Sequence, residues 1–272
     1  MQHTPSKRTA LVTGASAGIG KALAGLFARD GHNLILVART RERLETLAAD
    51  LRQSHGVRVD VVPADLAHSA APQAIFDAVT ALGVDVDFLV NNAGFGSNGA
   101  FAELPLSGEV DMVEVNCQAL LKLTHLFLGG MKARKFGRVL NIASTAAFQP
   151  GPFMATYYAS KAFVVSLSEA LSYELRGTGV TVTAHCPGAT ATEFAARAGN
   201  DKSRLFQRPG VASADAVAKD AYDACMAGKT LAIHGFLNAL LVQSLRFSPR
   251  AAVRGIAAAV NLPPKRLANP KD

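Results

Sequence analysis

Ser144, Tyr157 and Lys161 are the three residues of this chain whose types and spacing could move a proton. On a helix, residues 157 and 161 lie one turn apart on the same face, so that a phenol and an ammonium become neighbours. An unperturbed tyrosine has a pKa of about 10. Because a nearby positive charge favours the phenolate, the spacing predicts that Lys161 lowers the pKa of Tyr157, which could then exchange protons nearer neutral pH.

Tyr158 is the competing phenol. It would lie about 100° further round the same helix, without the one-turn relation to Lys161. We therefore expect Tyr157 to be the acid–base group and Tyr158 to pack or to line the site. Taken singly, Ser144 could be a turn residue at a strand end, and Lys161 could extend from a surface helix into solvent.

Short apolar segments and amphipathic segments alternate along the chain and would position these residues. Strands are predicted at 9–12, 33–39, 58–63, 86–91, 138–144 and 180–186. Helices are predicted from the first glycines to 30 and over 41–54, 70–82, 109–134 and 157–176. The strands lack polar alternation, which is typical of parallel sheets covered by helices on both faces. We predict an α/β fold, a Rossmann-like doubly wound parallel sheet forming one domain over 1–260, with a flexible tail at 261–272.

A glycine-rich turn follows the first predicted strand and opens the first helix: Thr13-Gly14-Ala15-Ser16-Ala17-Gly18-Ile19-Gly20. Glycines let the backbone approach a phosphate closely, and the free N–H groups of a helix N-terminus attract an anion. The alternative is a tight strand-to-helix turn without a ligand. The position directly after the first strand favours a nucleotide.

The end of the second predicted strand indicates which nucleotide is bound. An acidic residue there would bind the adenosine ribose hydroxyls of NAD and repel a 2′-phosphate. This chain instead has Ala38 and Arg39, followed by Arg41 and Arg43. Because a guanidinium suits a phosphate, we predict NADP(H) rather than NAD. Arg41 and Arg43 could alternatively be solvated residues at a helix start.

Composition and charge exclude several other classes of protein. The chain has 272 residues and a formal net charge of +7, and residues 231–272 carry six basic side chains against one acidic one. Since the remainder is close to neutral, a nucleic-acid-binding surface is not expected. Seven histidines show no metal-ligand spacing, and three widely spaced cysteines suit neither disulfides nor zinc. No signal peptide is recognisable at the N-terminus, and a cytoplasmic location is expected.

These motifs together resemble the short-chain dehydrogenase/reductase family, in its branch of about 250 residues. The resemblance runs from about Thr9 to Thr192 and includes the glycine turn and the Tyr-x-x-x-Lys motif. It also includes Asp65-Leu66, the segment Asn91-Asn92-Ala93-Gly94, and Pro187-Gly188 with Thr192. The resemblance implies that the cofactor is bound by Gly14, Ser16, Gly18, Ile19, Gly20, Arg39, Arg43, Asp65, Leu66, Asn91, Ala93, Gly94, Tyr157, Lys161, Pro187, Gly188 and Thr192.

The same resemblance implies the catalytic roles. Tyr157 would be the general acid in reduction and the base in oxidation, with Lys161 also binding the nicotinamide ribose. Ser144 would hydrogen-bond the substrate oxygen, and Asn116 would hold a water that links Lys161 to solvent. One departure is Ala17, where many NADP-using relatives have a basic residue, so that the phosphate would depend more heavily on Arg39.

The predicted function is an NADP(H)-dependent oxidoreductase that transfers a hydride between nicotinamide and a carbonyl or secondary alcohol, without a metal. The substrate is not identified, although residues 189–215 are expected to lie over it. The alternative is a non-catalytic NADP-binding sensor or scaffold protein of the same fold. Such proteins commonly lose the tyrosine or the lysine, and both are present here. Helices near 110–134 and 157–176 pair subunits in many relatives, which implies a homodimer or homotetramer.

The C-terminal segment is unusual because Arg246, Arg250 and Arg254 recur every four residues among apolar side chains. Pro249 is expected to divide this segment into two helices. One interpretation is peripheral contact with a membrane surface or with an acidic or acyl-carrier partner. The other, which the sequence favours, is a solvated helix face whose opposite side packs against the body or another subunit.

Overall fold

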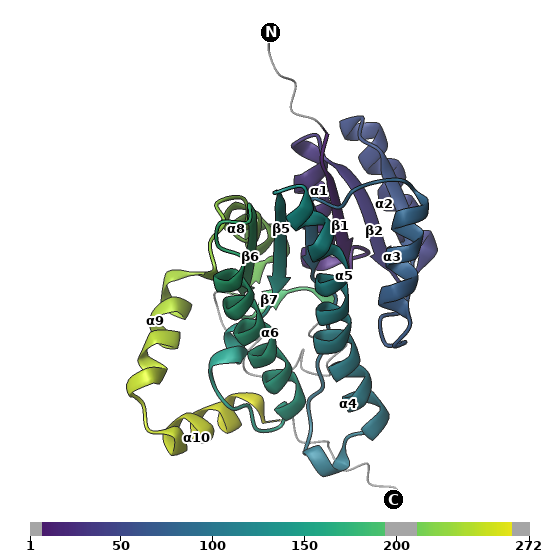
Figure 1. Ribbon diagram of the computed structural model, residues 1–272. Coiled ribbons are helices and arrows are strands. Elements are labelled where there is room, and N and C mark those ends of the chain that lie inside the picture. The colour runs from purple at the N-terminus through teal and green to yellow at the C-terminus, as the bar shows by residue number, and fades with distance from the viewer. Residues whose placement is uncertain (1–6, 194–210, 263–272) are drawn as a thin grey trace, which may run out of the picture.

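The computed structural model describes residues 7–193 and 211–262 and contains a seven-stranded parallel sheet with helices on both faces (Figure 1). The strand order is β3-β2-β1-β4-β5-β6-β9. The strands are β1 (Thr9–Thr13), β2 (Asn33–Ala38), β3 (Val59–Pro63), β4 (Phe88–Asn91), β5 (Gly137–Ile142), β6 (Val180–Cys186) and β9 (Leu231–Ile233). The predicted α/β fold is therefore confirmed.

Nine α-helices lie within the described part of the chain. They are α1 (Gly18–Arg29), α2 (Arg41–His55), α3 (Ala71–Ala81), α4 (Leu106–Val113), α5 (Leu120–Ala133), α6 (Ala155–Glu174), α8 (Ala214–Met226), α9 (Phe236–Ser244) and α10 (Arg250–Asn261). Shorter turns are η1 (Phe101–Glu103), the π-helical η2 (Glu114–Ala119), η3 (Thr145–Phe148) and η4 (Leu245–Phe247). None of these helices is both long and apolar enough to cross a membrane.

Apolar strands follow from this layering, because the inner strands of the sheet are buried on both faces. In β2, Leu34 and Leu36 belong to the core formed with α1, α2 and α8. Ile35 and Val37, which alternate with them, belong to the core formed with α3 and α5. Burying side chains on both faces requires an apolar residue at every position of a strand, which explains the absence of polar alternation.

The fold differs from the sequence prediction in several places, among them helix α8, which was not predicted. The helix predicted over 109–134 is divided into α4, η2 and α5, because the chain widens into a π-helical turn at Glu114–Ala119. The edge strand β9 was not predicted, since three residues are too few to show a pattern. Strand β5 ends at Ile142, so Ser144 lies beyond the strand and caps η3 instead.

Residues 194–210, most of the predicted substrate segment 189–215, lie outside the described residues, as do 263–272 of the predicted tail. The described ends of the substrate segment form a small parallel pair, β7 (Thr190–Ala191) with β8 (Ala212–Ser213).

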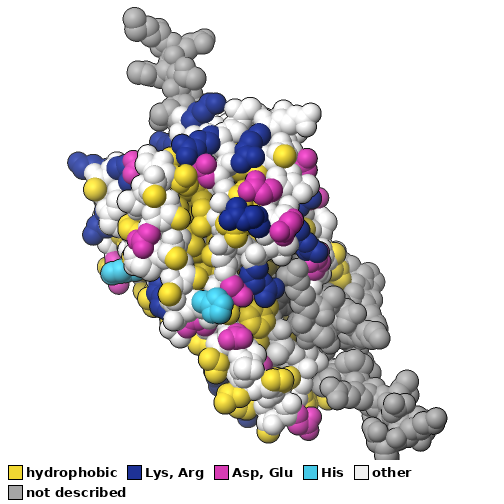
Figure 2. Space-filling view, turned by 90° about the vertical axis from the view of Figure 1, so that its right-hand side faces the viewer, with side chains coloured by type: hydrophobic (Ala, Val, Ile, Leu, Met, Phe, Trp, Pro, Cys, Tyr) yellow, Lys and Arg dark blue, Asp and Glu magenta, His cyan; other side chains and the backbone are white. Residues whose placement is uncertain are grey.

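On the side of α2 and α3, the described basic and acidic side chains are interspersed rather than gathered into a field of one sign (Figure 2).

Candidate active site

A cavity of about 680 Å³ opens at the carboxyl ends of the parallel strands, where ligands of doubly wound folds bind. Three of the predicted site residues, Gly20, Asn91 and Asn116, are not among its lining residues. The other predicted site residues line it: Gly14, Ser16, Gly18, Ile19, Arg39, Arg43, Asp65, Leu66, Ala93, Gly94, Ser144, Tyr157, Lys161, Pro187, Gly188 and Thr192. Folding therefore brings motifs from most of the chain to one place.

The glycine turn forms one end of this cavity. Gly14 and Gly18 have φ angles of 65° and 54°, in the left-handed region that favours glycine. Helix α1 begins at Gly18, and Ala17 gives its first N–H groups no side-chain cap, which leaves them for an anion. Gly20 lies behind the turn: a Cβ there would lie 2.4 Å from both Asn92 Nδ2 and Gly14 O, so this glycine allows close packing instead of lining the cavity.

Arg39 and Arg43 occupy different electrostatic settings at the edge of the cavity. Arg39 is exposed and directly follows β2. Arg43 Nη1 lies 3.4 Å from Glu193 Oε2 in an exposed ion pair. An acidic neighbour competes with a phosphate for the same guanidinium, so Arg39 is better placed than Arg43 to attract one.

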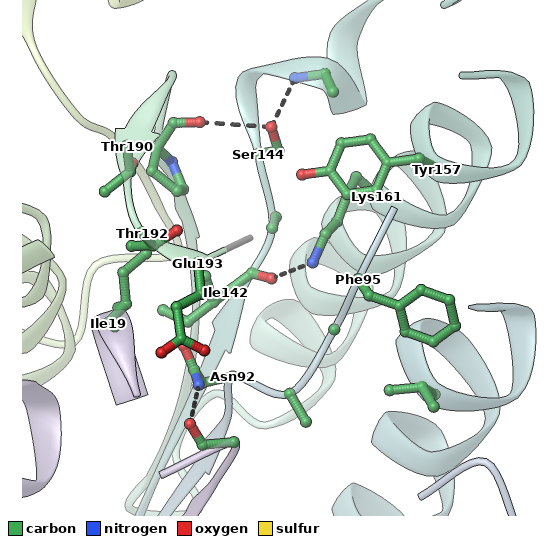
Figure 3. Close-up of a pocket in the computed structure, with 18 of the residues that line it drawn as sticks. Ile19, Asn92, Phe95, Ile142, Ser144, Tyr157, Lys161, Thr190, Thr192 and Glu193 are labelled. Carbon is green, nitrogen blue, oxygen red and sulfur yellow. Dashed lines mark hydrogen bonds between the residues drawn. The ribbon is translucent and has the colours of Figure 1, made fainter. Parts of the chain in front are cut away.

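Ser144 and Tyr157 meet in the middle of the cavity. Ser144 Oγ accepts a hydrogen bond from Ala146 N at 3.1 Å and donates one to Pro187 O at 3.5 Å. The Tyr157 hydroxyl points toward Ser144 (Figure 3). Burial raises the pKa of Tyr157 to about 12, while its hydrogen bond with Ser144 acts in the opposite direction. At neutral pH this phenol is therefore protonated.

Lys161 is buried beneath Tyr157. Its Nζ donates to Ile142 O at 2.8 Å and lies 5.9 Å from the centroid of the Tyr157 ring (Figure 3). Burial lowers the pKa of Lys161 to about 8. Burial is thus the largest cause of both pKa shifts in the cofactor-free protein, and an effect of Lys161 on the pKa of Tyr157 stays a prediction.

Asn116 lies in the π-helical turn η2 and is held by three hydrogen bonds to residues outside that turn. Its Nδ2 donates to Phe95 O and to Ser160 Oγ, both at 3.0 Å, and its Oδ1 accepts from Phe95 N at 3.1 Å. A Cβ placed on Gly94 would lie 3.0 Å from Asn116 Oδ1 and 3.5 Å from Lys161 Nζ. Asn116 therefore lies close to Lys161 although it does not line the cavity.

The two neighbouring asparagines of the Asn91-Asn92 pair point in different directions. Asn91 Nδ2 donates to Thr124 Oγ1 at 3.1 Å and to Asn141 Oδ1 at 2.9 Å, both inside the protein. Asn92 lines the cavity, and its Nδ2 donates to Thr13 O at 2.9 Å (Figure 3). Sequence reasoning chose Asn91 as the cofactor contact and missed Asn92, because adjacent residues of a strand end face opposite sides.

The far end of the cavity is apolar and was not predicted from the sequence. Helix α10 lines it with Ile256, Ala257 and Val260. Asn261, predicted to begin a flexible tail, is instead 1% exposed and accepts a hydrogen bond from Tyr158 Oη at 3.2 Å. This contact holds α10 against α6 and gives the second phenol its own partner.

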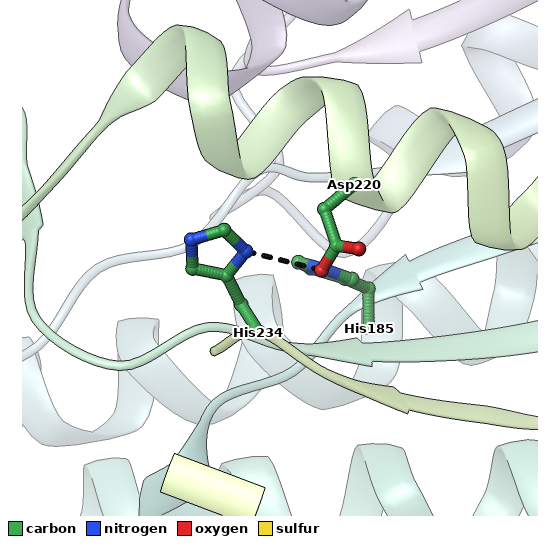
Figure 4. Close-up of side chains that lie close together, drawn as sticks. All are labelled: His185, Asp220 and His234. Carbon is green, nitrogen blue, oxygen red and sulfur yellow. Dashed lines mark hydrogen bonds and ion pairs between the residues drawn. The ribbon is translucent and has the colours of Figure 1, made fainter. Parts of the chain in front are cut away.

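His185, Asp220 and His234 form a second polar cluster (Figure 4). His185 Nε2 and His234 Nδ1 each lie 3.0 Å from the same oxygen, Asp220 Oδ2. The buried Nδ1 of His185 has no hydrogen-bond partner, whereas a metal-bound histidine usually donates its other ring N–H. The geometry therefore suits a hydrogen-bonded link between β6, α8 and β9 better than a metal site.

Comparison with known proteins places the chain among oxidoreductases. A family model described as "short chain dehydrogenase" matches residues 8–203. A very-long-chain 3-oxoacyl-CoA reductase of Phaeosphaeria nodorum is 40% identical over 182 residues, which are 65% of this chain but 53% of the relative, so the chain spans about half of that protein. A putative ketoacyl reductase 1 of the granaticin polyketide synthase of Streptomyces violaceoruber is 40% identical over 206 residues, 75% of each chain.

Solved structures agree with these sequence matches. A short-chain dehydrogenase from Sphingobium yanoikuyae, solved in complex with NADPH, superimposes with a TM-score of 0.79 and 34% identity. The superposition covers 88% of this chain and 93% of the other.

Proposed function

The chain belongs to the short-chain dehydrogenase family, and from this premise we propose that it is an NADP(H)-dependent oxidoreductase acting on a carbonyl or secondary alcohol. The observation that carries the proposal is the meeting of Ser144, Tyr157 and Lys161 in the cavity that the glycine turn and Arg39 also line. A sensor or scaffold protein would need the nucleotide end of this cavity but not the three polar groups at its centre.

The residues of the cavity fit a dinucleotide phosphate. The N-terminus of α1 and the left-handed glycines would hold the pyrophosphate, since no side-chain cap occupies the first backbone N–H groups of the helix. Arg39 would bind the 2′-phosphate, and Arg43 would contribute less because Glu193 already pairs with it. When bound, the nicotinamide supplies or accepts the hydride.

Tyr157 would deliver the proton in carbonyl reduction. A phenol whose pKa is raised to about 12 stays protonated at neutral pH and can donate to an oxygen that gains negative charge. Ser144 Oγ is placed to share that oxygen and to stabilise the developing charge. The cofactor-free protein thus has Tyr157 in the protonated form that carbonyl reduction requires.

Lys161 and Asn116 would restore the proton after each turnover. Both side chains approach the same point beside Gly94, within 3.5 Å of a Cβ built there. We propose that a water between them links Lys161 to solvent. The Lys161 pKa of about 8 suits this role, because the group can bind and release a proton near neutral pH.

The substrate would be an apolar ketone. Met154 and residues Ile256, Ala257 and Val260 of α10 give the cavity an apolar wall, although Asp111 and Gln149 also line it. Two of the similar proteins are named as reductases of 3-oxoacyl-CoA or ketoacyl groups. We therefore favour a 3-oxoacyl or similarly bulky apolar ketone.

A homo-oligomer is also proposed. The outer faces of α4, α5 and α6 expose Leu106, Leu121 and Phe163 by 72%, 43% and 37%, and pairing of these faces would bury them.

The test is NADPH oxidation followed by absorbance with 3-oxoacyl thioesters, steroid ketones, aldehydes and quinones. With any accepted carbonyl, Tyr157→Phe should lower kcat by a factor of about 100 or more while NADPH binding is preserved. Tyr158→Phe is the matched control, since it removes a hydroxyl that bonds to Asn261 and should reduce kcat far less. Unchanged turnover in Tyr157→Phe would refute the proposed role, and NADPH binding without turnover on any carbonyl would favour the sensor.

A further inference from the structure

The last described segment of the chain, residues 236–261, forms an arm made of α9, η4 and α10. It extends from β9, with α9 standing at the left edge of the molecule and α10 turning back beneath it (Figure 1). Pro249 separates the two helices, as the sequence predicted. Within α9, which is described in full, Val242 is the one buried residue.

The outer surface of this arm is strongly apolar. Two phenylalanines are almost fully exposed, Phe236 by 81% and Phe247 by 89%. Further large apolar side chains that are more than half exposed accompany them: Leu237, Leu240, Leu241 and Ile256. Contiguous apolar surface of this kind on a folded protein marks a site of interaction. The sequence favoured a helix whose apolar side packs against the body or another subunit, and these side chains do not pack against the body.

The charged side chains of the arm all have one sign. Arg246, Arg250 and Arg254 are exposed. From residue 224 to residue 271 the sequence contains neither aspartate nor glutamate. A surface that combines exposed aromatic and aliphatic side chains with arginines, and has no acidic group, is complementary to an anionic and partly apolar partner.

We propose that this arm docks the protein onto an anionic lipid surface. Helix α9, with nine residues, is too short to span a bilayer but long enough to lie in its interface. A second copy of the chain fits less well. Isologous pairing of two arms would bring six arginines together, with no carboxylate in either arm to neutralise them.

Docking would also bring the cavity to the lipid surface. Ile256 is 67% exposed and at the same time lines the cavity, so the arm carries one edge of its opening. The proposal itself depends on the exposed surface alone and stands whether or not the catalytic assignment is correct.

The experiment is flotation of the full chain with vesicles of phosphatidylcholine, or of phosphatidylcholine containing phosphatidylserine, at low and high salt. We expect binding to the anionic vesicles that weakens with salt. Arg246→Gln with Arg250→Gln should lower the partition constant about fivefold per arginine. Leu241→Ser with Phe247→Ser should lower it about tenfold or more.

Phe101→Ser with Met226→Ser is the control, because it removes exposed apolar side chains from η1 and α8, outside both the arm and the proposed subunit interface, and should not change flotation. NADPH binding and circular dichroism verify that each variant is folded. Sedimentation velocity is measured in parallel. The proposal is overturned if no vesicle binds the protein, if the control variant loses binding equally, or if the arm variants change only the oligomeric state.

Discussion

Replacing Lys161 with methionine is expected to stabilise the cofactor-free protein while abolishing turnover. Burial lowers the pKa of Lys161 from 10.5 to about 8, and this difference corresponds to about 3 kcal/mol by which folding disfavours the ammonium. Methionine has a similar shape without the charge. It leaves the Ile142 carbonyl without its donor at 2.8 Å, which costs about 1–2 kcal/mol. The net gain at pH 7 is therefore about 1–2 kcal/mol.

The pH dependence of this gain identifies its cause. Below about pH 8 the lysine is protonated in both the folded and the unfolded wild type, so the full penalty of the buried charge applies. Between about pH 8 and pH 10.5 the folded protein has released a proton that the unfolded chain still holds, and the wild type becomes more stable as pH rises. The advantage of the methionine variant should thus shrink by about 2 kcal/mol between pH 7 and pH 9.5.

Urea unfolding monitored by circular dichroism at pH 7, 8 and 9.5 measures this difference, without cofactor because ligand binding would add its own stabilisation. Lys21→Met on the exposed side of α1 is the control and should show no such pH-dependent gain. A Lys161→Met protein that is less stable than wild type by the same amount at every pH would refute the assignment of Lys161 as a desolvated ammonium.

Three further outcomes are expected. Arg39→Ala should weaken NADPH binding about tenfold or more with little effect on NADH binding, and Arg43→Ala should weaken NADPH binding less, because Glu193 pairs with Arg43. Fluorescence titration measures the ratio of NADPH affinity to NADH affinity for each variant. If Arg39→Ala leaves this ratio unchanged, Arg39 is not the phosphate ligand. Alcohol oxidation should accelerate as pH rises from 7 to 10, because Tyr157 acts as a base only after losing its proton and its pKa is raised to about 12. Initial rates that fall over this range would contradict a raised pKa of Tyr157. Asn261→Ala should lower the free energy of unfolding by about 1–3 kcal/mol, because α10 loses the side-chain hydrogen bonds of Asn261 to Tyr158 Oη and Pro152 O. It should also raise KM for bulky ketones more than it lowers kcat, and equal effects on small and bulky ketones would exclude α10 as a substrate wall.

Much of the architecture was predictable from local pattern. Continuous apolar strands alternating with amphipathic helices indicated the parallel sheet, and six of its strands were located from the sequence. The missing strand β9 and the π-helical turn η2 depend on contacts that a short window of sequence does not contain. Helix α10 was expected as part of a divided cationic segment, but its position as a wall of the cavity depends on Asn261 meeting Tyr158, 103 residues away.

The sequence by itself determined which chemical groups the site contains and where each one lies along the chain. A glycine turn after a strand, an arginine after the next, and a tyrosine one helical turn before a lysine are local patterns, and local geometry is set by residue spacing. The tertiary structure alone decided the protonation of these groups. Lys161 turns to the Ile142 carbonyl, and burial raises the pKa of Tyr157, because desolvation depends on packing by segments far apart in the chain.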